Sequence, residues 1–101
     1  MLFRSEDTVV DGKIHDDYRI DYLRDSVKSI AQAINLDGVE VIGLTVWGWI
    51  DIISAGTGEM KERYGLVYVD MDDEGRGSLK RIRKDSFRWY QKVIRSHGTE
   101  L

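Results

Sequence analysis

The stretch Val39-Glu40-Val41-Ile42-Gly43-Leu44-Thr45-Val46-Trp47 is rich in β-branched residues and almost continuously apolar. Such a run predicts a strand that is buried on both faces, as strands are in a parallel sheet covered by helices. One strand cannot form a sheet, because a buried amide group without a partner costs about 1–3 kcal/mol. We therefore expect this strand to need neighbouring strands, which is typical of a slice of a larger fold.

Amphipathic helices are expected on both sides of this strand. In the first, residues 17–34, apolar side chains from Ile20 to Ile34 recur at the spacing of one helix face. Asp16 or Asp17 can cap its start, and residues 35–38 end it at a glycine. The second helix, residues 85–96, is predicted to place Phe87, Tyr90 and Ile94 on one face, with Trp89 and Val93 beside it. The order helix, strand, helix indicates an α/β protein.

The remaining segments are predicted as loops and one hairpin. Residues 48–65 are glycine-rich and lack periodicity, so a long loop follows the strand, where function concentrates in parallel sheets. Residues 66–69 and 79–82 flank a polar connection and predict an exposed hairpin. Its acidic residues, from Asp70 to Glu74, lack the spacing of a calcium-binding loop and are better explained as a hairpin tip. Residues 1–16 predict an irregular segment.

The composition excludes several classes of function. With 101 residues, 42% hydrophobic, and a net charge of −3, the chain is typical of one globular unit. The absence of cysteine excludes disulfides, zinc–thiolate centres and thiol nucleophiles, and two histidines make a metal cluster improbable, so no cofactor or metal is expected. No apolar run approaches the length of a membrane span and no signal sequence is evident, so no membrane contact and a cytoplasmic location are expected.

Several motifs together resemble one enzyme family. They are His15-Asp16-Asp17-Tyr18-Arg19-Ile20-Asp21-Tyr22-Leu23, Trp47-Gly48, Thr57-Gly58-Glu59-Met60 and Arg63-Tyr64-Gly65. These runs resemble the C-terminal quarter of glycoside hydrolase family 1, and within it the bacterial 6-phospho-β-glucosidases. The resemblance implies a single fragment, residues 1–101, in which the irregular segment, 1–16, precedes the matching region, 17–98. It implies part of a (β/α)₈ TIM barrel, not closed, with 17–34 as the seventh helix, 39–47 as the eighth strand and 85–96 as the eighth helix.

The same resemblance implies that this polypeptide lacks the catalytic residues of the family. Retaining glycosidases need two carboxylates about 5–5.5 Å apart. Family members carry them in Asn-Glu-Pro and Glu-Asn-Gly motifs, whereas this chain has no proline and no Glu-Asn dipeptide. The register counted back from His15 places the nucleophile strand just before Met1. We therefore expect a truncated or split gene product with no catalytic residue of its own and no activity alone.

The resemblance also implies which residues bind substrate. Trp47 matches the tryptophan that forms the floor of the sugar pocket, although from composition alone a core position is the more common role. Ser54 and Tyr64 match part of a phosphate site. Lys61 and Glu62 depart from the family pattern, because they stand where a serine and the phosphate-binding lysine usually lie, and Gly56 replaces another serine. Lys61 is the candidate substitute for that lysine, so the expected ligand is a sugar or sugar phosphate.

Other functions and roles remain open from the residues themselves. The basic residues between Arg76 and Arg95 suit a nucleic-acid module, but the acidic chain and the helical spacing of its aromatic residues favour a solvated helix face, so no nucleic acid is expected. The open edges of residues 39–47 suit self-association or docking onto the missing part of the barrel. Asp51, Glu59 and Arg63 predict a structural ion cluster, and His15 predicts a hydrogen bond beside a helix start.

Overall fold

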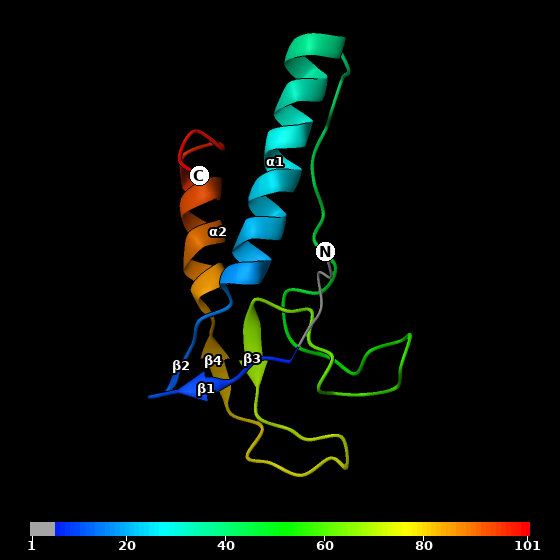
Figure 1. The fold of residues 1–101 in the computed structure, drawn as a ribbon, viewed down its shortest axis with the longest axis vertical. Helices are drawn as coiled ribbons and strands as arrows, with labels where there is room; N and C mark the ends of the chain where they lie inside the picture. Colours follow the sequence, from blue (N-terminus) through cyan, green and yellow to red (C-terminus); the bar gives the residue numbers. More distant parts are fainter. Residues whose placement is uncertain (1–5) are drawn as a thin grey trace.

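The computed structural model describes residues 6–101 and contains two helices and two small hairpins. In chain order the elements are β1 (Val9–Val10), β2 (Lys13–Ile14), α1 (Asp17–Asp37), β3 (Val67–Val69), β4 (Arg81–Arg83) and α2 (Asp85–Arg95). Figure 1 shows the two helices side by side, with both hairpins below their N-terminal ends. No helix within residues 6–101 is long and apolar enough to cross a bilayer.

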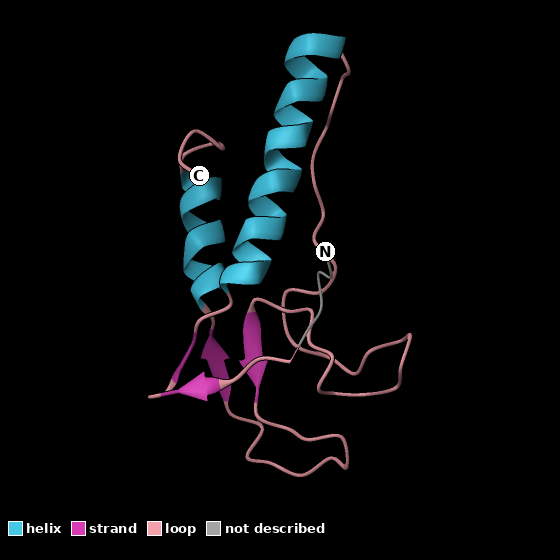
Figure 2. Cartoon of the chain, viewed as in Figure 1, coloured by secondary structure: helices cyan, strands magenta, loops and turns pink. Residues whose placement is uncertain are grey.

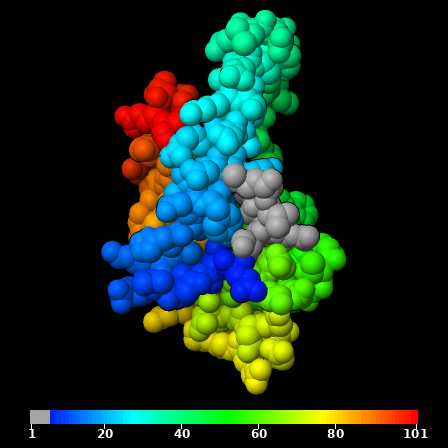
Figure 3. Space-filling view, viewed as in Figure 1, coloured from blue at the N-terminus to red at the C-terminus, as the bar shows by residue number. Residues whose placement is uncertain are grey.

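Helix α1 confirms the first predicted helix and its stop signal. Gly38 follows the last helical residue with φ +68°, in the left-handed region that glycine adopts without strain, and its N–H donates to the carbonyl of Ala33. The C-terminal half of α1 projects beyond α2 and stands clear of the other elements (Figure 3). Most side chains there are exposed, including Ile34 and Leu36, and within residues 6–101 no helix or strand covers them.

Asp16 caps a helix, but not the one predicted. Its side chain makes no capping bond to α1, which begins one residue later. Instead its carboxylate accepts the backbone N–H of Ser86 at 2.9 Å and the Ser86 hydroxyl at 2.5 Å, in the first turn of α2. His15, predicted to bond beside a helix start, lies 2.6 Å from the carboxylate of Asp85, also on α2. The residues that precede α1 therefore hold the start of α2.

The core lies where α1 and α2 cross. Its buried members are Leu23, Leu66, Trp89 and Val93. The buried stripe of α2 is thus one residue out of phase with the predicted face, because Trp89 and Val93 point at α1 whereas Ile94 is 60% exposed. Phe87 and Tyr90 pack only at the edge of this core. The helix was predicted correctly, but its inward face was not.

The predicted strand at residues 39–47 does not form. The segment is extended and runs back along α1 (Figure 2), but none of its residues is buried and Trp47 is 60% exposed. Residues 40–48 make no backbone hydrogen bond to any other residue within 6–101. A parallel strand needs neighbours on both edges, and the described residues supply none. Burial on both faces was therefore a wrong prediction for this polypeptide.

The two hairpins differ in how well the sequence predicted them. Strands β3 and β4 confirm the predicted hairpin, with Tyr68 opposite Ile82. Residues 9–14 form a second, shorter hairpin in the segment predicted as irregular, with Val9 opposite Ile14. Its two-residue turn has φ +52° at Asp11 and +71° at Gly12, as tight hairpin turns require. The hairpin buries Ile14 and brings the N-terminal segment against β4.

Asp70, at the base of the β3–β4 connection, is expected to titrate below an ordinary aspartate. The hydroxyl and the N–H of Ser78 donate to its carboxylate and hold its pKa below 3.8. A lowered pKa in the folded state adds stability above that value, and the contribution is lost as the pH falls through the folded pKa. A ¹³C NMR titration of the Asp70 carboxyl checks this. Ser78→Ala should raise its pKa, Ser96→Ala should not, and an Asp70 pKa of 3.8 or higher contradicts the prediction.

Candidate functional site

The candidate site is the loop that the sequence placed after the predicted strand, and its two ends lie against each other. The N–H of Asp51 donates to Val67 at 3.0 Å, and the N–H of Leu66 donates to Trp49 at 2.9 Å. Gly65 makes this approach possible, because a Cβ at that position would lie 2.3 Å from the Ile50 carbonyl carbon. Residues 51–65 therefore form a closed loop whose base is a short piece of paired backbone.

Two of the four predicted site residues meet inside this loop. The hydroxyls of Ser54 and Tyr64 lie 2.9 Å apart. Ser54 is buried, and two backbone hydrogen bonds hold it. Its N–H donates to the backbone carbonyl of Glu59 at 3.0 Å, and its carbonyl accepts the N–H of Gly58 at 2.8 Å. The loop thus presents a pair of hydroxyl groups on a backbone that is locally fixed.

The other two predicted residues lie apart from this pair. Lys61 forms a 2.9 Å ion pair with Glu59 at the surface, and the hydrogen bond that its ammonium group donates to that carboxylate raises the pKa of Lys61. Trp47 lines a cavity of about 220 Å³ together with Tyr22 and Leu23 of α1. The structure therefore joins Ser54 to Tyr64, but not Trp47 or Lys61 to either of them.

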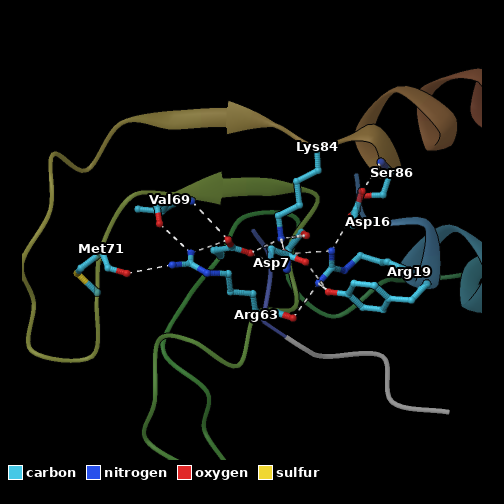
Figure 4. Close-up of polar contacts among 11 residues, drawn as sticks. Asp7, Asp16, Arg19, Arg63, Val69, Met71, Lys84 and Ser86 are labelled. Carbon is cyan, nitrogen blue, oxygen red and sulfur yellow. Dashed lines mark hydrogen bonds and ion pairs between the residues drawn. The ribbon is translucent and has the colours of Figure 1, made fainter. Parts of the chain in front are cut away.

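Beneath the loop lies a buried network of charged side chains (Figure 4). Among residues 6–101 it contains three carboxylates and three cations: Asp7, Asp16, Asp51, Arg19, Arg63 and Lys84. The formal charges of these six side chains cancel, which favours their burial in a protein interior. The members come from the N-terminal segment, α1, the loop and the residue before α2, so the network connects parts of the chain that are distant in sequence.

Lys84 and Arg63 each bind one oxygen of the Asp51 carboxylate. The ammonium group of Lys84 donates to Asp7 at 2.5 Å, to Asp51 at 2.8 Å and to the Gly65 carbonyl at 2.7 Å, which uses all three of its hydrogens. Arg63 donates to the other oxygen of Asp51 at 2.9 Å and to the carbonyls of Val69 and Met71. The predicted Asp51–Arg63 pair is therefore present, whereas Glu59 lies outside it and pairs with Lys61.

Arg19 joins α1 to this network. Its guanidinium donates to Asp16 at 2.5 Å, to the Tyr18 hydroxyl at 2.6 Å and to the Arg63 carbonyl at 2.9 Å. Burial opposes the charge of Arg19, but Asp7, Tyr18 and Asp16 outweigh it and raise the pKa of the guanidinium. Burial and the hydrogen bond to Asp7 likewise raise the pKa of the Tyr18 phenol.

The sequence reasoning missed Asp7, Arg19 and Lys84, although two of them carried a signal. Arg19 lies four residues before Leu23 and therefore falls on the buried stripe of α1. Lys84 lies two residues after Ile82, on the side of the strand that turns inward. A charged residue at a position whose periodicity predicts burial indicates a buried ion pair. Asp7 carried no comparable pattern.

Comparison with known proteins agrees with the resemblance seen in the sequence. The family pattern for glycosyl hydrolase family 1 matches residues 3–99. A 6-phospho-β-glucosidase from Dickeya chrysanthemi is 59% identical over 90 residues, which are 89% of this chain and 19% of that protein. An aryl-phospho-β-D-glucosidase from Bacillus subtilis is 58% identical over 91 residues, 90% of this chain and 19% of that protein.

A solved structure supports the same assignment. The family 1 glycoside hydrolase of Thermotoga maritima superposes with a TM-score of 0.82 at 37% identity, over 96% of this chain and 20% of that one. The chain thus spans about a fifth of the length of the proteins it matches, and residues 6–101 form no closed barrel. Because the family pattern covers nearly all of its residues, the chain belongs to glycosyl hydrolase family 1.

Proposed function

We propose that residues 39–64 supply the C-terminal part of the sugar site of a retaining β-glycosidase that hydrolyses β-glucosides, including 6-phosphorylated ones. The observation that carries the proposal is the Ser54–Tyr64 hydroxyl pair, 2.9 Å apart on a closed loop. Relatives at 52–59% identity are named 6-phospho-β-glucosidases, which favours a phosphorylated substrate. In the barrel, α1 is the seventh helix, residues 39–47 the eighth strand and α2 the eighth helix.

Each predicted site residue has a chemical role in this proposal. The Trp47 ring offers an apolar face on which a pyranose ring can stack. The hydroxyls of Ser54 and Tyr64 can donate to phosphate oxygens, and a hydrogen bond to a charged acceptor is about twice as strong as a neutral one. Lys61 supplies positive charge once its ion pair with Glu59 opens. We expect no role for a cofactor or metal.

The hydrolytic step itself needs groups that this polypeptide does not carry. Two carboxylates must face each other across the glycosidic bond, one as nucleophile and one as acid and then base. The two family motifs that hold them are absent from the 101 residues. We therefore expect no turnover by this polypeptide alone, and we propose that activity requires the remaining strands of a barrel.

Residues 39–47 provide the surface for that association. Within residues 6–101 the backbone of residues 40–47 makes no backbone hydrogen bond, and the exposed apolar side chains of the segment include Ile42, Leu44 and Trp47. A strand of this kind pairs readily with other strands. We propose docking to the missing part of the barrel, and the same edges make self-association the second candidate. The cytoplasmic location stays a prediction.

The assay uses the purified chain with p-nitrophenyl β-glucoside and with its 6-phosphate. We expect no turnover above a protein-free blank from the chain alone. Turnover should occur after mixing with a polypeptide that carries the other four fifths of a family 1 phospho-glucosidase. Light scattering tests self-association, the second candidate. A dimer of the chain alone that dissociates when the second polypeptide is added supports both self-association and docking. Turnover by the chain alone, or none in the mixture, contradicts the proposal.

Tyr64→Phe is expected to separate the two substrates in the active mixture. Losing one hydrogen bond to a charged group costs about 1.5–3 kcal/mol, so KM for the 6-phosphate should rise roughly 10- to 100-fold. KM for the plain glucoside should change little, because that substrate has no phosphate. Tyr90→Phe, on α2, is the matched control and should leave both values unchanged. Equal effects of Tyr64→Phe on both substrates would remove the proposed phosphate contact.

A further inference from the structure

Lys84 holds the base of the loop through both its backbone and its side chain. Its N–H donates to the Leu66 carbonyl at 3.0 Å, and its ammonium group donates to the preceding carbonyl, of Gly65, at 2.7 Å. The same ammonium group reaches Asp51 at 2.8 Å, at the other end of the loop. This fully buried cation, labelled in Figure 4, thus binds the residue where the loop begins and the residue where it ends.

Asp51 completes this connection from the opposite side. The Asp51 oxygen that accepts from Lys84 also accepts the N–H of Gly65 at 3.0 Å, so the two ends are joined directly as well. Its second oxygen accepts from Arg63 at 2.9 Å. Removing the cation would leave the Asp51 and Asp7 carboxylates buried and close to each other with less compensating charge.

Tyr64 immediately precedes Gly65, so its Cα belongs to the peptide unit whose N–H Asp51 accepts, while Lys84 holds the carbonyl that follows. Ser54 lies three residues after Asp51, on the other arm of the loop. The 2.9 Å distance between the Ser54 and Tyr64 hydroxyls therefore depends on how the two arms meet at the base. Lys84 is the residue outside the loop that binds both arms with its side chain.

We propose that Lys84 is a positioning residue for the substrate loop: by binding Asp51 and Gly65 together, its ammonium group keeps the Ser54 and Tyr64 hydroxyls within hydrogen-bond distance. The proposal rests on the proposed function in that it assigns these hydroxyls to the substrate. It adds a residue that touches no substrate and lies 20 positions from Tyr64 in the chain. Orientation of binding groups by their supporting contacts is a general requirement of precise sites.

The test is amide hydrogen exchange on the 101-residue chain with Lys84→Met, which keeps the length of the side chain and removes its charge. The amides of Ser54 and Gly58, bonded within the loop, should exchange about 10- to 100-fold faster than in the unsubstituted chain. Amides in the middle of α1 should change much less. Lys80→Met, an exposed lysine on the same hairpin, is the matched control and should alter neither set.

Two outcomes would overturn the proposal. Unchanged exchange in the loop would show that Lys84 is not needed, and an equal acceleration in loop and helices would show a general structural role. If Lys84→Met does not fold, the double variant Asp51→Asn with Lys84→Met removes both charges. The exchange rates of its loop and helix amides are then compared in the same way, and faster exchange confined to the loop supports the proposal. Glucose 6-phosphate binding, followed by chemical shifts of Tyr64, reports separately: its absence contradicts the phosphate site, whereas the exchange result still decides the role of Lys84.

Discussion

Gly65→Ala is expected to lower the free energy of unfolding by about 3 kcal/mol, at the upper end of what inserted atoms usually cost. The added Cβ would lie 2.3 Å from the Ile50 carbonyl carbon and 2.4 Å from the Asp51 nitrogen. Both are backbone atoms, so no side chain can rotate away. The arms of the loop would have to separate, and with them the contacts of Lys84 and Asp51. Urea unfolding followed by circular dichroism measures the effect.

Gly43→Ala is the matched control for this prediction. A Cβ there meets no atom within 4 Å, and the residue has no positive φ. Its free energy of unfolding should stay within about 0.5 kcal/mol of the unsubstituted chain, as for most exposed substitutions. If Gly65→Ala unfolds at the same urea concentration as Gly43→Ala, the close approach of the two arms does not exist in solution.

Arg19→Met is expected to lower the free energy of unfolding by about 3–5 kcal/mol, at least as much as Gly65→Ala. The reason is that it removes one partner from a buried ion network. Arg19 is fully buried and donates to Asp16, Tyr18 and the Arg63 carbonyl. Without it, the carboxylates of Asp7 and Asp16 lose one of their cations in an environment that water cannot reach. Thermal and urea unfolding give the change in stability.

The control for Arg19→Met is Lys28→Met, which removes the same charge from an exposed position of α1 and should change little. A double variant identifies the cause. Asp16→Asn keeps an oxygen for the Ser86 N–H but removes the negative charge. The double variant Arg19→Met with Asp16→Asn should therefore lose less unfolding free energy than the two single variants lose in sum. Strict additivity would mean that the two charges do not stabilise each other.

The sequence predicted the elements that depend on local signals. Both helices, the glycine stop at Gly38 and the β3–β4 hairpin formed where periodicity and turn residues placed them. Residues 39–47 failed as a strand because strand formation depends on partners, and a run of β-branched residues cannot supply them. The inward face of α2 was off by one residue because Asp16 and Leu23, distant in sequence, decide which side of α2 turns inward.

The candidate site was likewise predicted where local sequence carried a signal and missed where it depended on distant residues. The resemblance selected Ser54 and Tyr64, which meet, but it gave no means of seeing that Glu59 holds Lys61. The charged network was largely missed because its members are spread from residue 7 to residue 84, and only the folded chain brings them together. Arg19 and Lys84 could have been found by noticing charges at positions whose spacing predicts burial.

Asp16 has a consequence for the order in which this chain comes apart. Because the residue before α1 holds the first turn of α2, neither helix can lose its N-terminal turn without releasing the other. The first turns of α1 and α2 therefore open together as one cooperative foldon. The projecting end of α1 lies outside that foldon, and its peptide groups can fray and re-form while the rest of the chain stays native.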